Sequence, residues 1–402
     1  MPSTSATPVS APASISADRR TPLWEAGFRP FFLGAMVYGG LAMVVWMASF
    51  GFGLALPGLG AHASLWHAHE MIYGYGAAVV AGFLLTAARN WTGQPTATGP
   101  ALAALFALWV AARIACLVDV DARVAALLDL TFNLALLVAV ARPILRVRQW
   151  RQMGILTKLL LITLGNGAFY LGALGMLDNG MWLSVHAGLY VLIGLILTMA
   201  RRLIPFFTER GVGEPVSLRN SRALDVACLA AYLAWFVLVL TGATPRAAGA
   251  VALLLTVLHG VRLHGWWTPR ILERPLLWSL HLAYGCMVLA FALAAAAGFG
   301  MLPFTLAMHL LALGGIGLVT VSMMARVALG HTGRDVHAPP RALTGVFALL
   351  VASMVARVLL PLAWPSHYVA LVIAAQALWI ACFAWLCVLY APLLLAPRAD
   401  AG

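Results

Sequence analysis

Two imidazoles and a carboxylate lie within four positions of one apolar segment. The segment SLWHAHEMIYGYG runs from Ser64 to Gly76 and contains His67, His69 and Glu70. Neutral imidazole is a common metal ligand that suits iron and copper, and a haem iron can be held by histidine. A neighbouring carboxylate can fix the tautomer of a ligating histidine or relay protons. These residue types predict metal or haem chemistry at this point of the chain.

Four histidines lie near the same end of three apolar segments. They are His67, His69, His186 and His309, and we predict that they include the ligands of a haem, because ionisable groups in a membrane usually face the interior and have partners there. His67 and His69 are two positions apart, so on a helix they point about 200° away from each other. Only one of the two is therefore expected to face a given metal.

A second group of histidines lies toward the opposite end of the predicted helices. It comprises His259, His264, His281 and His331, and we predict that it includes the ligands of a second centre, either copper or another haem. His259 and His264 are five positions apart and diverge by about 140° around a helix. We therefore expect only one of them to join His281.

Glu70 is the predicted catalytic residue. It lies one helical turn from His67, where it could accept the second ring proton of that histidine, and it could equally relay protons to a reacting group. Arg113 and Asp129 are expected at a comparable depth. That placement favours a structural ion pair at least as much as a functional one.

The composition indicates the elements that must position these side chains. Hydrophobic residues make up 63% of the chain and charged residues only 9%, which is typical of an integral membrane protein, and a transmembrane helix needs about 20 mostly apolar residues. We predict an all-α fold of about twelve transmembrane helices in a lipid bilayer. They are expected near residues 30–55, 65–88, 99–118, 123–142, 155–176, 181–206, 222–242, 247–268, 276–299, 303–328, 341–363 and 367–396.

The basic residues predict the orientation of these helices, because cytoplasmic loops carry most of the Arg and Lys. Of the 25 basic residues, only Arg123 and Arg246 fall in predicted outer loops, and only Arg113 and Arg357 fall within spans. Both termini are therefore expected in the cytoplasm. This topology also explains the net charge of +12, so nucleic-acid binding is excluded as its cause.

One membrane domain accounts for nearly the whole chain. We predict a disordered cytoplasmic tail over residues 1–22, which are rich in Ser, Ala and Pro and lack the apolar run of a signal peptide. The twelve-helix domain is expected over residues 23–396, and a short cytoplasmic tail over residues 397–402.

Three of the predicted helices share a sequence pattern. Each opens with a histidine, runs through small and apolar residues and closes with Ala-Arg. The segments are HAHEMIYGYGAAVVAGFLLTAARNWTG from His67, HAGLYVLIGLILTMARRLIPFFTERG from His186 and HLLALGGIGLVTVSMMARVALGHTG from His309. They belong to the second, sixth and tenth helices, which predicts three pseudo-repeats of four helices whose repeated members converge on one interior. The alternative is that Gly-rich helices ending in Arg are simply common in membranes.

Several longer motifs resemble those of the NnrS family. The resemblance runs from about residue 22 to the end of the twelfth helix. The motifs are GFRPFF at 27–32, WHAHEM at 66–71, AGFLLTAARNWTG at 81–93, RLIPFFT at 202–208, RPLLWSLH at 274–281 and MMARVALGHTGR at 323–334. Members are described as bacterial inner-membrane proteins that contain haem and copper and are linked to the nitric oxide response. The resemblance thus implies haem, expected to be of b type, copper, and nitric oxide as the ligand.

Three functions remain open at this point. The first is an oxidoreductase that binds nitric oxide at haem and reduces it, with an electron donor that nothing in the sequence identifies. The second is a non-catalytic haem protein that sequesters or senses nitric oxide, and the third is a transporter, which would also use Gly-rich repeated helices. Histidines on helices two, six and ten also resemble the arrangement in the haem–copper oxidase catalytic subunit, but that likeness is one of topology alone.

Overall fold

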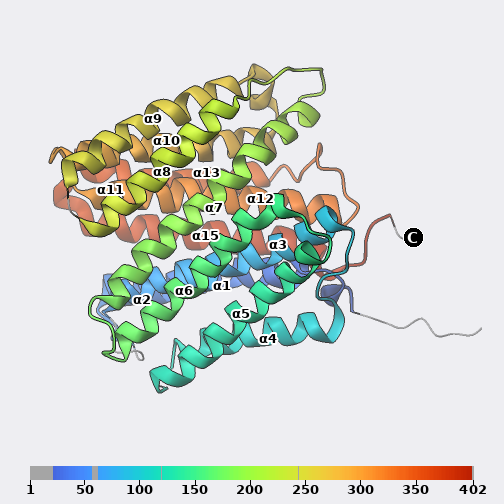
Figure 1. The fold of residues 1–402 in the computed structure, drawn as a ribbon, viewed down its shortest axis with the longest axis horizontal. Helices are drawn as coiled ribbons and strands as arrows, with labels where there is room; N and C mark the ends of the chain where they lie inside the picture. Colours follow the sequence, from blue (N-terminus) through green and yellow to red (C-terminus); the bar gives the residue numbers. More distant parts are fainter. Residues whose placement is uncertain (1–20, 57–61, 119, 243, 401–402) are drawn as a thin grey trace, which may run out of the picture.

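Twelve apolar helical stretches form one bundle in the part of the chain that the structure describes (Figure 1). The structure is a computed structural model, and it describes residues 21–56, 62–118, 120–242 and 244–400. Eleven helices there are long and apolar enough to cross a membrane, and a twelfth, Gly99–Ala115, is apolar but shorter. The prediction of an all-α fold with about twelve spans is confirmed. Most of the predicted tail, residues 1–20, lies outside the described residues.

The observed helices begin and end within a few residues of the predicted spans. Three spans contain a π-helical segment, and these segments are η2, η5 and η6. In chain order the spans are α1 (Phe28–Phe52); α2 (Ala63–His69), η2 (Glu70–Gly76) and α3 (Ala77–Thr92); α4 (Gly99–Ala115); α5 (Ala122–Arg146); α6 (Met153–Ala173); α7 (Gly180–Gly211); α8 (Arg222–Thr241); α9 (Pro245–Gly265); α10 (Pro275–Gly298); α11 (Phe304–His309), η5 (Leu310–Gly317) and α12 (Leu318–His331); α13 (Leu343–Met354), η6 (Val355–Leu359) and α14 (Leu360–Ala363); and α15 (Tyr368–Leu395).

Leucine and valine side chains cover the outside of the bundle. Leu127 is 68% exposed, Leu164 is 60% exposed and Val388 is 72% exposed, which would be unfavourable in water but suits contact with lipid tails. Each helix satisfies its own backbone hydrogen bonds, as a bilayer requires. The exposed surface and the secondary structure thus agree on a multi-pass membrane protein.

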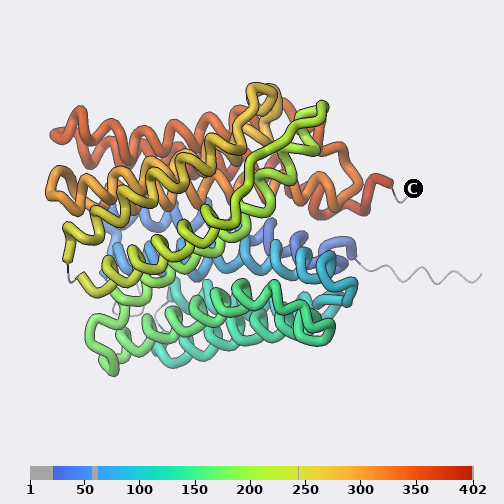
Figure 2. The backbone as a smooth tube through the Cα atoms, turned by 45° about the horizontal axis from the view of Figure 1, so that its top comes forward, coloured from blue at the N-terminus to red at the C-terminus, as the bar shows by residue number. Residues whose placement is uncertain are grey.

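The start of α1 and the end of α15 lie at the same end of the bundle (Figure 2). Arg29 connects them, because its Nη1 donates to the carbonyl oxygens of Leu394 at 2.8 Å and Ala396 at 2.6 Å. This end also carries most of the basic residues, among them Arg89, Arg146, Arg210, Arg270 and Arg341. We call it the arginine-rich end.

The three helices with the repeated pattern form the centre of the bundle. The most apolar windows of the spans Ala63–Thr92, Gly180–Gly211 and Phe304–His331 are 89%, 72% and 61% buried, whereas no other long span exceeds 56%. Residues of all three line one apolar cavity of about 70 Å³. The predicted convergence of these helices is confirmed, while the threefold relation of the repeats stays a prediction.

Candidate functional site

Two of the predicted haem ligands lie close together at the end of the bundle opposite the arginine-rich end. His67 on α2 and His309 on α11 are near enough for their charges to interact. Arg357 on η6 lies beside them, with its Nη2 3.1 Å from Nε2 of His309. Both histidines are half-buried and Arg357 is only 9% exposed. Three distant parts of the chain thus place two imidazoles and a guanidinium in one group, which we call the His67–His309 pair with Arg357.

Each imidazole of this pair presents a ring nitrogen that could act as a ligand. Nδ1 of His309 donates to the carbonyl oxygen of Thr305 at 2.7 Å, which leaves Nε2 as the unprotonated nitrogen facing Arg357. Within the described residues, Nδ1 of His67 is buried without a hydrogen-bond partner. The His67 ring stacks on Trp46, with 4.8 Å between centroids and 9° between planes. A buried imidazole nitrogen without a partner is unfavourable, so the pair has unused capacity to bind a ligand.

The local helix geometry is irregular around the same residues. The segment η2 begins directly after His69, η5 begins directly after His309, and η6 contains Arg357. The π-helix is rare and often occurs at functional sites, because the wider turn redirects side chains. In this structure its three occurrences among the described residues all border the charged and imidazole side chains near this end of the bundle.

A buried network of charged residues surrounds His69. Glu70 is fully buried, and its carboxylate accepts from Nδ1 of His69 at 2.7 Å, from Nη1 of Arg113 at 2.7 Å and from the hydroxyl of Tyr38. Nη2 of Arg113 also lies 2.5 Å from a carboxylate oxygen of Asp129. One guanidinium thus bridges two carboxylates that are both 0% exposed. This pairing satisfies buried charges that would otherwise be very unfavourable.

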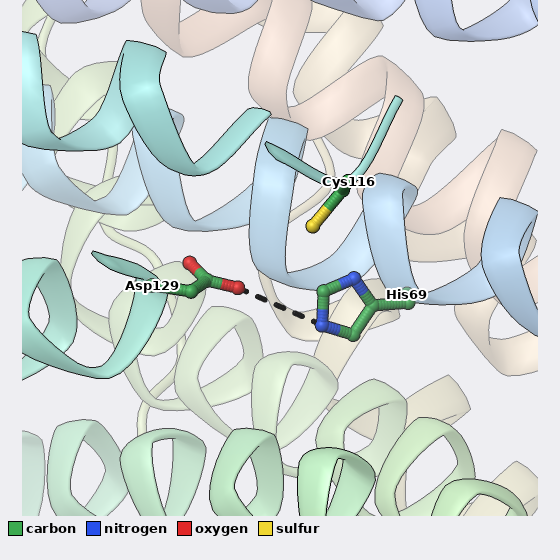
Figure 3. A group of neighbouring side chains, drawn as sticks. All are labelled: His69, Cys116 and Asp129. Atoms are coloured by element: carbon green, nitrogen blue, oxygen red, sulfur yellow. Dashed lines mark ion pairs between the residues drawn. The ribbon is translucent and has the colours of Figure 1, made fainter. Parts of the chain in front are cut away.

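His69, Cys116 and Asp129 form a group that could hold a metal ion (Figure 3). One ligand atom from each residue lies within 4.8 Å of the others, and all three residues are buried. In the structure, Nε2 of His69 contacts Oδ1 of Asn166 at 2.9 Å and lies 3.6 Å from Asp129. The Cys116 thiol contacts the hydroxyl of Tyr170 at 3.5 Å.

These partners limit what the His69, Cys116 and Asp129 group can bind. Both ring nitrogens of His69 face hydrogen-bond partners, and Arg113 holds Asp129. A bound cation would have to displace that guanidinium and would be repelled by it. The arrangement is suited to stabilising buried charge, and a metal would require it to rearrange.

Two predictions about this region can now be compared with the geometry. The Arg113–Asp129 ion pair is confirmed. The expectation that Glu70 accepts a proton from His67 is wrong, because the carboxylate accepts from His69 instead. The cause is the divergence expected for residues two apart on a helix: His67 turns toward Trp46 while His69 turns toward Asn166.

His186, the remaining member of the first histidine group, has its contacts on its own helix. Its Nδ1 donates to the carbonyl oxygen of Trp182 at 2.8 Å, and its ring stacks on that indole with 4.2 Å between centroids. The predicted role of His186 in haem binding stays a prediction.

The second histidine group does not gather at one point. His264 is exposed, and His331 packs against Phe28 with 5.6 Å between centroids. His259 and His281 are connected through two aromatic residues. Nδ1 of His259 contacts the hydroxyl of Tyr284 at 2.5 Å, the Tyr284 ring packs against Trp266, and the carbonyl oxygen of Trp266 faces His281.

His281 has hydrogen-bond partners for both of its ring nitrogens. They face the carbonyl oxygens of Leu277 at 3.0 Å and Trp266 at 3.4 Å. Metal binding by this second group stays a prediction.

Sequence reasoning missed three residues of these groups. Tyr38 and Cys116 carry no local pattern that distinguishes them from packed core residues. Arg357 was recognisable as a basic residue within an apolar span, which is costly and therefore usually functional. The partner of Arg357 could not be identified from the sequence, because Arg357 meets His309 only where α11 packs against η6.

The chain was also compared with known proteins. The family model described as NnrS protein matches residues 22–398, nearly the whole chain. None of the curated proteins compared with the chain matches it.

Proposed function

Because this chain belongs to the NnrS family, we propose that it is a membrane haem protein that binds nitric oxide and reduces it. Two molecules of nitric oxide would take up two electrons and two protons to give nitrous oxide and water. The observation that carries the proposal is the His67–His309 pair with Arg357, in which Nδ1 of His67 has no hydrogen-bond partner within the described residues and His309 contacts a buried guanidinium.

The donor atoms of this group are suited to haem. Imidazole nitrogens bind haem iron, and arginine pairs with carboxylates such as the haem propionates. Nη1 of Arg357 has no hydrogen-bond partner within the described residues, and neither has Nδ1 of His67. Haem supplies, when bound, an iron that can take up nitric oxide and pass on single electrons. His67 would hold that iron, and Arg357 would hold a propionate.

The number of ligating imidazoles decides between reduction and simple storage. With His67 and His309 both holding one haem iron, the group would be suited to storage or sensing. With only one of them on the iron, the haem could take up nitric oxide and the other imidazole could hold copper, which also accepts imidazole ligands. We propose the second arrangement, with His67 on the haem because its Nδ1 has no hydrogen-bond partner within the described residues. His309 would hold copper, for which its Nε2 must release the contact with Arg357.

The buried network around Glu70 would provide the polar side of the site. Glu70 lies on the same span as His67, directly after His69, and it is connected through Arg113 to Asp129. A carboxylate in such a network can pass protons when its hydrogen bonds to the neighbouring groups rearrange. We propose this role for Glu70.

A spectrum of the purified protein tests the proposal. We expect a haem signal in the reduced-minus-oxidised spectrum, which His67→Ala abolishes or shifts, while His309→Ala lowers the copper content and leaves haem in place. The matched control is His367→Ala, an exposed residue just before α15, which should leave both signals unchanged. Absence of haem from the folded wild-type protein would refute the proposal.

One observation favours sequestration or sensing as a second candidate. The Glu70 carboxylate already accepts from three donors, Tyr38, His69 and Arg113, and such a satisfied carboxylate is held in place more firmly than a relay requires. If wild-type protein with full haem forms no nitrous oxide when a competent electron donor is supplied, the non-catalytic function is the correct one.

A further inference from the structure

A large cavity lies away from the His67–His309 pair, between α6, α7, α8 and α9. Its volume is about 510 Å³, which is in the range of small-molecule sites. Leu229 and Leu233 form part of its wall and are each 54% exposed on the outside of the bundle. Because that surface faces lipid tails, a ligand soluble in the membrane could enter from the side.

Three residues that line this cavity carry a buried polar atom without a hydrogen-bond partner in the described part of the chain, and in one of them, Asp225, that oxygen pairs with Arg201. The other two atoms are the hydroxyl of Tyr190 and Nε2 of His259, from side chains that are 0% and 2% exposed. Neither atom has a hydrogen-bond partner within the described residues. Leaving such groups unpaired in an apolar surrounding is costly, so each is a candidate contact for a ligand.

The other contacts of His259 define what the ligand must offer. Nδ1 of His259 contacts the hydroxyl of Tyr284 at 2.5 Å, and with its proton on Nδ1 the free Nε2 is an acceptor. The Tyr190 hydroxyl can donate. A suitable ligand therefore presents a hydroxyl to His259 and an oxygen acceptor to Tyr190, on an apolar body that fills the space between them.

The alternatives for this cavity explain fewer of its features. A phospholipid could place its headgroup near Lys158, Arg201 and Arg202 at the arginine-rich end of the cavity, but its acyl chains offer no hydroxyl to Nε2 of His259. A hydroquinone has two oxygens at opposite sides of an aromatic ring and carries an apolar tail. It offers a partner of the right kind to each atom, and its tail can pass through the opening to lipid.

We propose that this cavity binds a membrane quinol, which donates the electrons for the reaction. The inference rests on the proposed function. One quinol and two molecules of nitric oxide give one quinone, one nitrous oxide and one water. The quinol loses two electrons and two protons, and the two nitric oxide molecules gain them.

A chain of polar contacts connects the cavity with the arginine-rich end. Nη1 of Arg262 lies 3.5 Å from the Tyr284 hydroxyl, and Nη2 of Arg262 donates to Asp225 at 2.8 Å. Asp225 also pairs with Arg201, which is 45% exposed. Protons released by the quinol at His259 thus have polar partners along a route to the surface.

Binding measurements on the purified holoprotein test the site without nitric oxide. The probes are the reduced forms ubiquinol-1 and menaquinol-1, added anaerobically to the reduced holoprotein, and we expect at least one to bind. Tyr190→Phe removes only the hydroxyl and should weaken binding about tenfold, the scale of one lost hydrogen bond. Tyr390→Phe is the matched control, because the Tyr390 hydroxyl is also buried and unpartnered but lies on α15 outside the cavity.

The His259 position provides a second, independent readout. His259→Leu should weaken binding about tenfold or more and slow anaerobic reduction of the haem by ubiquinol-1, while His259→Gln, which keeps an acceptor, should restore part of both. Unchanged affinity in Tyr190→Phe and His259→Leu, or loss of haem or copper from folded His259→Leu, would overturn the quinol site.

Failure of this proposal and failure of the proposed function can be told apart. Nitrous oxide formation driven by ascorbate with a soluble mediator does not need the quinol site. Mediator-driven activity without quinol binding removes only the quinol proposal. Quinol binding and haem reduction without nitrous oxide formation remove only the proposed reduction of nitric oxide.

Discussion

At the scale of single residues, Arg113 determines whether the buried charges near His69 are balanced. It pairs with Glu70 at 2.7 Å and with Asp129 at 2.5 Å, and it is 3% exposed. Arg113→Leu leaves two buried carboxylates without this cation and should destabilise the protein by about 3–5 kcal/mol. The loss should appear as a lower midpoint of thermal unfolding in detergent.

Removing one carboxylate together with Arg113 should recover part of that loss. The double variant Arg113→Leu/Asp129→Leu leaves fewer uncompensated charges than Arg113→Leu alone, so we expect it to unfold at a higher temperature than the single variant. The single variant Asp129→Leu completes the comparison. If the changes in unfolding free energy of the two single variants simply add up in the double variant, Arg113 and Asp129 are not energetically coupled.

Glu70 allows the catalytic and structural roles to be separated. Glu70→Gln keeps the size of the side chain but removes its charge, so it should retain haem and slow nitrous oxide formation by about 10²-fold, the scale of a lost proton-transfer group. Haem occupancy and turnover are measured on one preparation. Weaker haem binding instead would indicate that the carboxylate only orients its neighbours, and full activity with full haem would eliminate both roles.

The residue types of the site could be predicted from the sequence, but most of the partners could not. Basic, acidic and imidazole groups are rare in a chain with 9% charged residues, so Arg113, Asp129 and the histidines were easy to single out. Which histidine Glu70 contacts depends on the side-chain directions at the start of η2. The proximity of His67 and His309 depends on tertiary packing between spans that are far apart in sequence, which no local pattern encodes.

At the scale of elements, small residues set the distance between helices, as is common in membranes. Gly298 on α10 lies against Gly249 on α9, and a Cβ built at Gly298 would lie 2.6 Å from Cα of Gly249 and 2.7 Å from the carbonyl oxygen of Pro245. Because these neighbours are backbone atoms, the helices must move apart. Gly298→Ala should therefore destabilise the protein by about 1–3 kcal/mol.

A second glycine on the same helix provides the control for this prediction. A Cβ at Gly285 would meet its nearest neighbour, Cδ2 of Leu263, at 3.6 Å, an ordinary contact. Gly285→Ala should leave the unfolding temperature unchanged or raise it, because alanine favours helix over glycine. Equal effects of the two substitutions would contradict a close approach of α9 and α10.

The helices themselves were predictable because each apolar run has the length that a bilayer requires. The π-helical segments were not predictable, although two of them interrupt spans with the repeated pattern. Tyr75 on η2 contacts the hydroxyl of Thr320 on α12 at 2.6 Å, and no local sequence pattern encodes such contacts between spans. The quinol cavity was equally hidden, since Tyr190 and His259 are far apart in sequence.

At the scale of the whole molecule, the distribution of arginine predicts the orientation in the membrane. The described chain begins and ends at the arginine-rich end (Figure 1), and cytoplasmic loops carry the basic residues. The His67–His309 pair with Arg357 would then lie toward the outer face of the membrane. The polar chain from His259 to Arg201 would lead to the cytoplasm.

Single cysteines on exposed loop residues test this orientation. Ser217 follows α7 at the arginine-rich end, and Ser366 precedes α15 at the opposite end. A membrane-impermeant maleimide should label Ser366→Cys in intact cells and Ser217→Cys only after lysis. The wild-type protein is the control, because four of its five cysteines are buried and Cys387 is partly buried. The reverse labelling pattern would invert the topology, so that protons released at the quinol cavity would leave on the outer side and those consumed near Glu70 would come from the cytoplasm.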